Sequence, residues 1–64
     1  MDLEEIGKLV KERRKELGID QATLDALANV GINAIVRLER GTGNPRFNVL
    51  YSVLKTVGLD IVLK

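Results

Sequence analysis

The sequence contains no cysteine and no histidine, and each absence excludes a class of structure or chemistry. Without cysteine there is no disulfide and no thiolate metal site, and without histidine a zinc site is not expected. Neither a Ser–His nor a Cys–His pair can form, so nucleophilic catalysis by such pairs is excluded. We therefore expect no enzyme activity, no cofactor and no bound metal.

Long apolar runs are also missing, as is a strong net charge of either sign. No uninterrupted apolar stretch approaches the roughly 18 residues of a membrane span, and the acidic start of the chain is unlike a signal peptide. These features predict a cytoplasmic protein without a membrane partner. With 64 residues and a net charge of +1, the chain is expected to form one domain over residues 1–64. Its stability would be marginal without good packing or oligomerisation.

The sequence does contain amphipathic helix patterns, separated by glycine, asparagine and proline. Apolar spacing predicts four helices, over residues 3–17, 21–28, 32–40 and about 47–57. Asp20 is placed to cap the second helix, and Asn29 tolerates the left-handed backbone that would end it. The inward stripes of these helices carry the expected core: Leu3, Ile6, Val10, Leu17, Leu24, Leu27, Ile35, Leu38, Phe47, Leu50, Val53 or Leu54, and Val57.

Two charged residues lie on these apolar stripes. Arg14 follows Val10 by four positions in the first helix, and Glu39 follows Ile35 by four in the third. Because charged side chains are rarely buried without a partner, we expect Arg14 and Glu39 to form an ion pair that joins the two helices. The alternative is that each side chain snorkels to solvent.

The segment after Gly58 alternates in hydrophobicity and predicts a short β-strand over residues 59–64. No second strand is predicted, so this strand would leave its backbone groups unpaired. We expect it to pair with the same strand of a second copy across a twofold axis, giving a homodimer with these interface residues: Leu59, Ile61, Val62 and Leu63. A frayed terminus is the alternative.

Two short helices joined by three residues have the dimensions of a helix-turn-helix. Several short motifs accompany this spacing: Arg13-Arg14-Lys15-Glu16-Leu17-Gly18-Ile19-Asp20-Gln21, Ala28-Asn29-Val30-Gly31, Leu38-Glu39-Arg40-Gly41 and Asn44-Pro45. Together, over about residues 5–58, they resemble the Cro/CI-type (XRE-like) helix-turn-helix family of lambda-repressor-like DNA-binding domains. The resemblance implies a mostly α fold, a bundle of four to five helices, to which the C-terminal strand would be added.

The resemblance further implies a sequence-specific transcriptional regulator, here interpreted as a repressor, that binds double-stranded DNA. As a homodimer it would bind an inverted-repeat operator. Base contacts would come from the outward face of the third helix: Ile32, Asn33, Val36 and Arg37. Phosphate contacts would come from Gln21, Arg40, Thr42, Asn44 and Arg46. The tail also resembles the Hip-type antitoxin branch, which implies a HipA-type kinase toxin as a further candidate partner.

Some features of the sequence leave open the geometry of the motif and a second function. Asp25 stands where the family usually has alanine, at the crossing of the two helices, so their crossing angle is in question. Ile32 and Val36 are apolar residues on a predicted outward face, which favours a protein-interaction module of the same fold. The excess of basic residues between positions 31 and 55 is modest, which also favours the interaction module, whereas Asn33, Arg37 and the phosphate-contact residues of the loop favour DNA.

Overall fold

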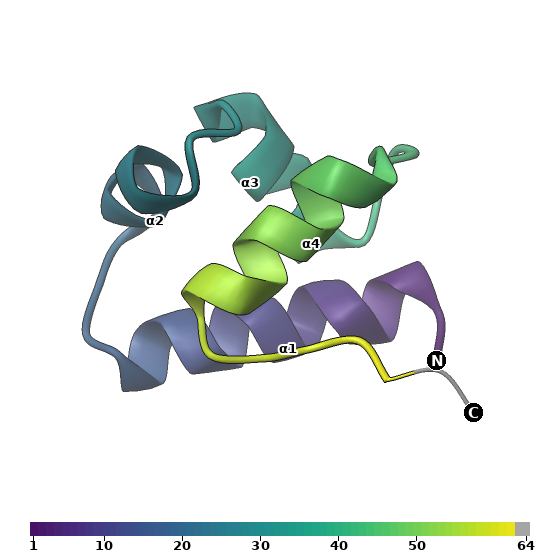
Figure 1. Ribbon diagram of the computed structural model, residues 1–64, viewed down its shortest axis with the longest axis horizontal. Helices are drawn as coiled ribbons and strands as arrows, with labels where there is room; N and C mark the ends of the chain where they lie inside the picture. Colours follow the sequence, from purple (N-terminus) through teal and green to yellow (C-terminus); the bar gives the residue numbers. More distant parts are fainter. Residues whose placement is uncertain (63–64) are drawn as a thin grey trace.

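The computed structural model describes residues 1–62, which form four α-helices and no β-strand. The helices are α1 (Leu3–Glu16), α2 (Gln21–Ala28), α3 (Ile32–Arg40) and α4 (Phe47–Thr56). The longest, α1, lies along one side of the molecule, with α2 and α3 above it and α4 crossing in front (Figure 1). The four predicted helices are therefore confirmed to within one residue at each end. No helix of the described chain is long and apolar enough to cross a membrane.

Side-chain caps explain where α1 and α2 begin. The carboxylates of Asp2 and Asp20 accept the backbone amides of Glu5 and Thr23, at 2.8 and 2.7 Å. These bonds satisfy donors that have no partner within the first turn of a helix. The hydrogen bond from the Thr23 amide also lowers the pKa of Asp20. The predicted Asp20 cap is confirmed, and so is the left-handed Asn29, which ends α2 with φ 57°.

The core is apolar and lies where all four helices meet. Its fully buried side chains are Val10, Leu24, Ile35, Leu38, Val53 and Val57, and the partly buried Leu3, Ile6 and Leu50 pack against them. Three predicted core residues are instead exposed: Leu17 by 49%, Leu27 by 64% and Phe47 by 66%. Leu17 follows the last turn of α1, and Phe47 lies in the first turn of α4, ahead of its buried residues. In the eight-residue α2, only Leu24 and Ala28 reach the core.

Gly7 allows the closest approach between α1 and α3. It is buried within α1, and a Cβ atom at this position would collide with the backbone carbonyl group of Leu38. Beside it, a Cβ atom on Gly41 would lie 2.6 Å from the Cα atom of Glu4. Because the obstructing atoms belong to the main chain, a side chain at either position would push the helices apart. Gly7 lies on the apolar stripe of its helix, but its role in this contact was not predicted from the sequence.

The tail after α4 runs across the front of α1 (Figure 1). Leu59 and Ile61 pack against the core, whereas Asp60 and Val62 are exposed, so the predicted alternation is present. The predicted strand is nevertheless absent from residues 59–62, because a single chain offers this segment no strand to pair with. The apolar side that was expected to need a partner covers the chain's own core. Leu63, also predicted at the interface, lies outside the described residues.

The contact at Gly7 predicts a large loss of stability on adding one methyl group. We expect Gly7→Ala to lower the free energy of unfolding by about 2 kcal/mol or more. This loss would occur even though alanine is the better helix former by about 1 kcal/mol. Urea unfolding followed by circular dichroism measures the change, with Lys8→Ala on the exposed side of α1 as the control. A Gly7→Ala variant as stable as the parent would contradict the close packing described above.

Candidate nucleic-acid interface

The turn between α2 and α3 is held by Asp25. Its carboxylate accepts the backbone amide of Gly31 at 2.6 Å, and its carbonyl oxygen accepts the amide of Asn29, also at 2.6 Å. Gly31 precedes α3 with φ 98°, a conformation that favours glycine, and provides no side-chain cap of its own. Asp25, which stands where the family usually has alanine, therefore stabilises this turn by accepting the backbone amide of Gly31.

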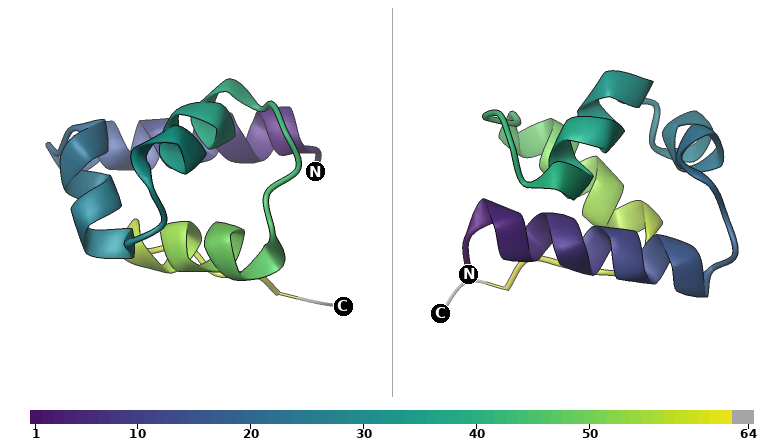
Figure 2. Two further views of the ribbon diagram at one scale, coloured as in Figure 1. Left: turned by 90° about the horizontal axis from the view of Figure 1, so that it is seen from above. Right: turned by 180° about the vertical axis from the view of Figure 1, so that it is seen from behind.

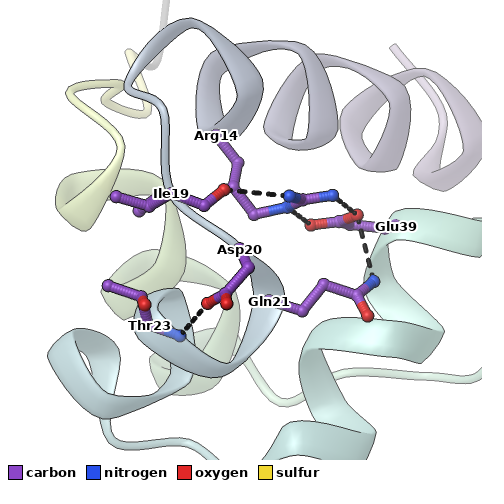
Figure 3. Close-up of polar contacts among 6 residues, drawn as sticks. All are labelled: Arg14, Ile19, Asp20, Gln21, Thr23 and Glu39. Atoms are coloured by element: carbon purple, nitrogen blue, oxygen red, sulfur yellow. Dashed lines mark hydrogen bonds and ion pairs between the residues drawn. The ribbon is translucent and has the colours of Figure 1, made fainter.

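The predicted ion pair is confirmed, and it is bidentate. Arg14 donates from Nε and Nη2 to the two carboxylate oxygens of Glu39, at 2.7 and 3.0 Å. The two side chains are only 11% and 3% exposed. The hydrogen bond to Glu39 raises the pKa of Arg14. Arg14 also donates from Nη1 to the carbonyl oxygen of Ile19 at 3.0 Å, so one guanidinium joins α1, the loop before α2, and α3 (Figure 3).

Gln21 extends this cluster into α2. As the first residue of that helix, it donates from Nε2 to the Oε1 atom of Glu39 at 3.2 Å (Figure 3). The carboxylate of Glu39, which belongs to α3, therefore binds both α1, through Arg14, and α2, through Gln21. The amide nitrogen of glutamine carries two hydrogens, so a second hydrogen remains for another acceptor. The predicted contact between Gln21 and a DNA phosphate therefore stays compatible with its bond to Glu39.

The face of α3 opposite the core carries the four residues that the sequence predicts at DNA bases. Ile32 is 42% exposed, Asn33 and Arg37 are exposed, and Val36 is half-buried. Ile35 and Leu38 are buried on the other side of the helix. The spacing of the four outward residues, in two adjacent pairs one turn apart, gives a single accessible strip along α3.

A pocket of about 230 Å³ lies after α3, and three of the five predicted phosphate-contact residues line it together with Arg37. Its walls come from α3, the loop and the start of α4: Ala34, Arg37, Leu38, Thr42, Gly43, Asn44, Pro45, Arg46 and Val49. The guanidinium of Arg37 lies on the loop, where a Cβ atom on Gly43 would be 3.1 Å from Nη2. Arg40, the exposed last residue of α3, and Gln21 do not line this pocket.

The surface around α3 and its loop is positively charged because Glu39 is buried. Glu39 is the single acidic residue between positions 31 and 55, and Arg14 neutralises it inside the protein. The exposed charges of that stretch are all positive: Arg37, Arg40, Arg46 and Lys55. Within residues 1–62 no acidic side chain lies at ion-pair distance from these three arginines, and no acidic cluster suited to a metal ion occurs. The surface therefore attracts anions such as phosphate.

Two residues that shape the site were not predicted from the sequence. Gly43 makes room for the guanidinium of Arg37, and Ser52 donates to the carbonyl oxygen of Ala28 at 2.9 Å, which holds the end of α2 on α4. The glycine in the loop offered a weak signal, since it lies two residues before the proline. Nothing in the helical pattern distinguishes Ser52 from an ordinary exposed serine.

Two short helices held together by buried contacts, the second with Asn33 and Arg37 on its outward face beside Ile32 and Val36, define a helix-turn-helix protein. Residues 10–63 match the helix-turn-helix family, and the chain belongs to it, as a member of the XRE type indicated by its motifs. An uncharacterized HTH-type transcriptional regulator of Haemophilus influenzae is 32% identical over 60 residues, which are 94% of this chain and 59% of that protein. Another, from Sinorhizobium fredii, is 39% identical over 57 residues, 89% of this chain and 75% of that protein. The chain thus spans little more than half of the Haemophilus relative.

The geometry of the ion pair predicts that either partner is costly to remove. We expect Arg14→Ala and Glu39→Ala each to lower the free energy of unfolding by about 3 kcal/mol, because each leaves an unpaired charge in a buried position. In the double variant neither charge is stranded, so its loss should fall well below the sum of the two. Urea unfolding of the three variants measures this coupling. Single losses under about 0.5 kcal/mol, the range of an ordinary surface substitution, would contradict the burial of the pair.

Proposed function

We propose that this protein binds double-stranded DNA sequence-specifically and regulates transcription, with α3 lying in the major groove. The observation that carries the proposal is the pairing of a rigid helix-turn-helix with an outward strip that continues into an arginine-lined pocket. The membership of the chain in the helix-turn-helix family supports the same function. So do the names of its relatives in Haemophilus and Sinorhizobium.

The residues of the outward strip have side chains suited to base edges. Asn33 pairs with adenine through two hydrogen bonds, and Arg37 pairs with guanine after turning its exposed side chain away from the loop. Ile32 and Val36 contact thymine methyl groups, which accounts for apolar residues on this face. The degree of exposure along the strip supports these roles, since Ile32, Asn33 and Arg37 are all accessible.

The loop pocket is suited to the DNA backbone. Thr42, Asn44 and Arg46 bring a hydroxyl, an amide and a guanidinium to one place. The first turn of α4 has no side-chain cap, so its backbone amides add further donors for an anion. Gln21 and Arg40 complete the set of phosphate contacts on either side of α3. Contacts of this kind fix the position of the protein on the duplex without reading its sequence.

We further propose that the protein binds an inverted-repeat operator as a homodimer, through the tail. Within residues 1–62, no main-chain group of residues 60–62 hydrogen-bonds to another main-chain group. Leu59 and Ile61 are held on the core, and the backbone edge of this segment, where the Ile61 amide now donates to Oδ1 of Asp60 at 2.8 Å, would pair with the same segment of a second copy. A twofold would set the two α3 helices about 34 Å apart, one turn of the duplex.

Repression and an antitoxin role are finer proposals. Repression depends on the resemblance to the Cro/CI-type family, and the antitoxin role depends on the resemblance of the tail to the Hip-type branch, which implies a HipA-type kinase toxin as partner. The competing function is a protein-interaction module, favoured by the 42% exposure of Ile32. Binding to the preferred duplex that is weakened more by Arg37→Ala than by Ile32→Ser supports the regulator, and the absence of any DNA binding by the folded chain supports the interaction module.

The two proposed kinds of contact predict different mutational effects. Arg37→Ala should cost about 1–3 kcal/mol on the preferred duplex and relax the choice of base at one position. Arg46→Ala should weaken binding to all sequences alike and reduce the salt dependence by about one unit of slope. Fluorescence anisotropy with duplexes selected from a random library, and with scrambled duplexes, measures both. Equal losses on every duplex for both variants would contradict this division of roles.

If the tails of two copies pair as strands, a substitution at the exposed Val62 should decide whether the protein is a dimer or a monomer in solution. Val62→Pro removes a backbone amide while leaving Leu59 and Ile61 on the core, so the expected dimer should dissociate to a folded monomer. Val62→Thr, which keeps the amide and suits a strand, is the matched control and should remain dimeric. Sedimentation velocity measures the mass of each. A dimer that tolerates proline, or a parent chain that is monomeric, would contradict pairing through the tail.

A further inference from the structure

The only two aromatic side chains of the protein lie together on the surface of α4. Phe47 and Tyr51 stack with ring centroids 5.7 Å apart and planes within 11°, although they are 66% and 38% exposed. The ammonium of Lys55 lies 6.0 Å from the centroid of the Tyr51 ring. The core and the proposed DNA contacts account for neither ring. An exposed pair of large apolar side chains is a common mark of an interaction surface.

We call Phe47, Tyr51 and Lys55 the α4 stripe. Their order along the helix makes the stripe complementary to a second, antiparallel copy of itself. Phe47, Tyr51 and Lys55 follow one another at intervals of four, so they lie along one side of the helix. If two copies of α4 meet antiparallel about a twofold axis at Tyr51, each Phe47 faces the Lys55 of the other copy. The arrangement repeats on both sides of the axis, as an isologous interface requires. An ammonium against the face of an aromatic ring is an attractive contact.

We propose that the α4 stripe is a contact surface for a second copy of this chain, with the two α4 helices antiparallel. The inference rests on the homodimer of the proposed function and adds a contact surface to it. In the view from above, α4 and the tail lie at the same edge of the molecule and α1 lies at the opposite one (Figure 2). Lys55 also bonds to Asp60 of the tail at 3.2 Å, so the α4 stripe adjoins the segment proposed to pair.

The chemistry of the α4 stripe favours a second copy over a duplex. The outer surface of a duplex offers phosphates, which two uncharged aromatic rings do not recognise. A second copy instead supplies an aromatic ring for each ammonium and an ammonium for each ring. The one cation of the α4 stripe, Lys55, pairs with the carboxylate of Asp60, so the self-contact brings no excess of like charge together.

Exchanging Phe47 and Lys55, the two end residues of the α4 stripe, tests whether the two helices meet antiparallel. Phe47→Lys places two ammonium groups opposite each other twice, so we expect the dissociation constant of the dimer to rise about tenfold or more. The double variant Phe47→Lys/Lys55→Phe restores a ring opposite each ammonium and should return to within about threefold of the parent. Leu27→Gln, which removes an equally exposed apolar residue from α2, is the control and should leave the dimer unchanged. Sedimentation equilibrium measures all four proteins, and thermal unfolding verifies that each is folded.

Three results would overturn the inference: a parent chain that is monomeric throughout the concentration series, a Phe47→Lys variant that dimerises like the parent, or a double variant as weak as the single one. Anisotropy with duplex DNA, run on the same samples, separates this inference from the proposed function. The expected exchange pattern without any DNA binding leaves the α4 contact standing and contradicts the DNA-binding proposal. If the protein binds DNA and its dimerisation is unaffected by the substitutions at Phe47 and Lys55, only the α4 contact is contradicted.

Discussion

One buried guanidinium–carboxylate pair holds this small protein in the arrangement that its surface requires. Arg14 of α1 reaches the carboxylate of Glu39 near the end of α3, and Gln21 brings the start of α2 to the same oxygen. Helices of eight and nine residues are too short to be stable alone, so their relative position depends on such tertiary contacts. The same pair buries the one acidic side chain between positions 31 and 55, which leaves the exposed charges beside α3 basic.

Backbone packing complements this polar cluster. Gly7 brings α1 against the end of α3 so closely that no side chain fits between them. The turn after α2 is fixed from inside the motif, by the carboxylate of Asp25 on the amide of Gly31. Close packing and a closed turn together leave α3 little freedom, while its outward strip stays accessible. The proposed division of the surface follows. DNA contacts α3, its loop and the backbone amides of the first turn of α4, and a second copy contacts the exposed side chains of α4 and the tail.

The sequence predicts most of the fold, because the signals for helix ends and for the ion pair are local or pairwise. A cap such as Asp20, or two charges such as Arg14 and Glu39 on apolar stripes, can be recognised without knowing the fold. Predictions that needed the neighbouring helix were less successful. Leu27 and Phe47 follow the apolar pattern but lie where no partner helix covers them. The place of Arg37 on its loop depends on a glycine in the next segment, a tertiary relation that periodicity does not contain.

We propose that DNA contacts one continuous surface, formed by α3 and the loop at residues 41–46. The most direct test of this proposal is the change in backbone amide chemical shifts when a selected duplex is added to isotopically labelled protein. We expect the largest changes at the starts of α2 and α4, along residues 32–37 and in the loop, with small changes along α1. Changes confined to the middle of α4 and the tail, with α3 and the loop unaffected, would contradict the proposal.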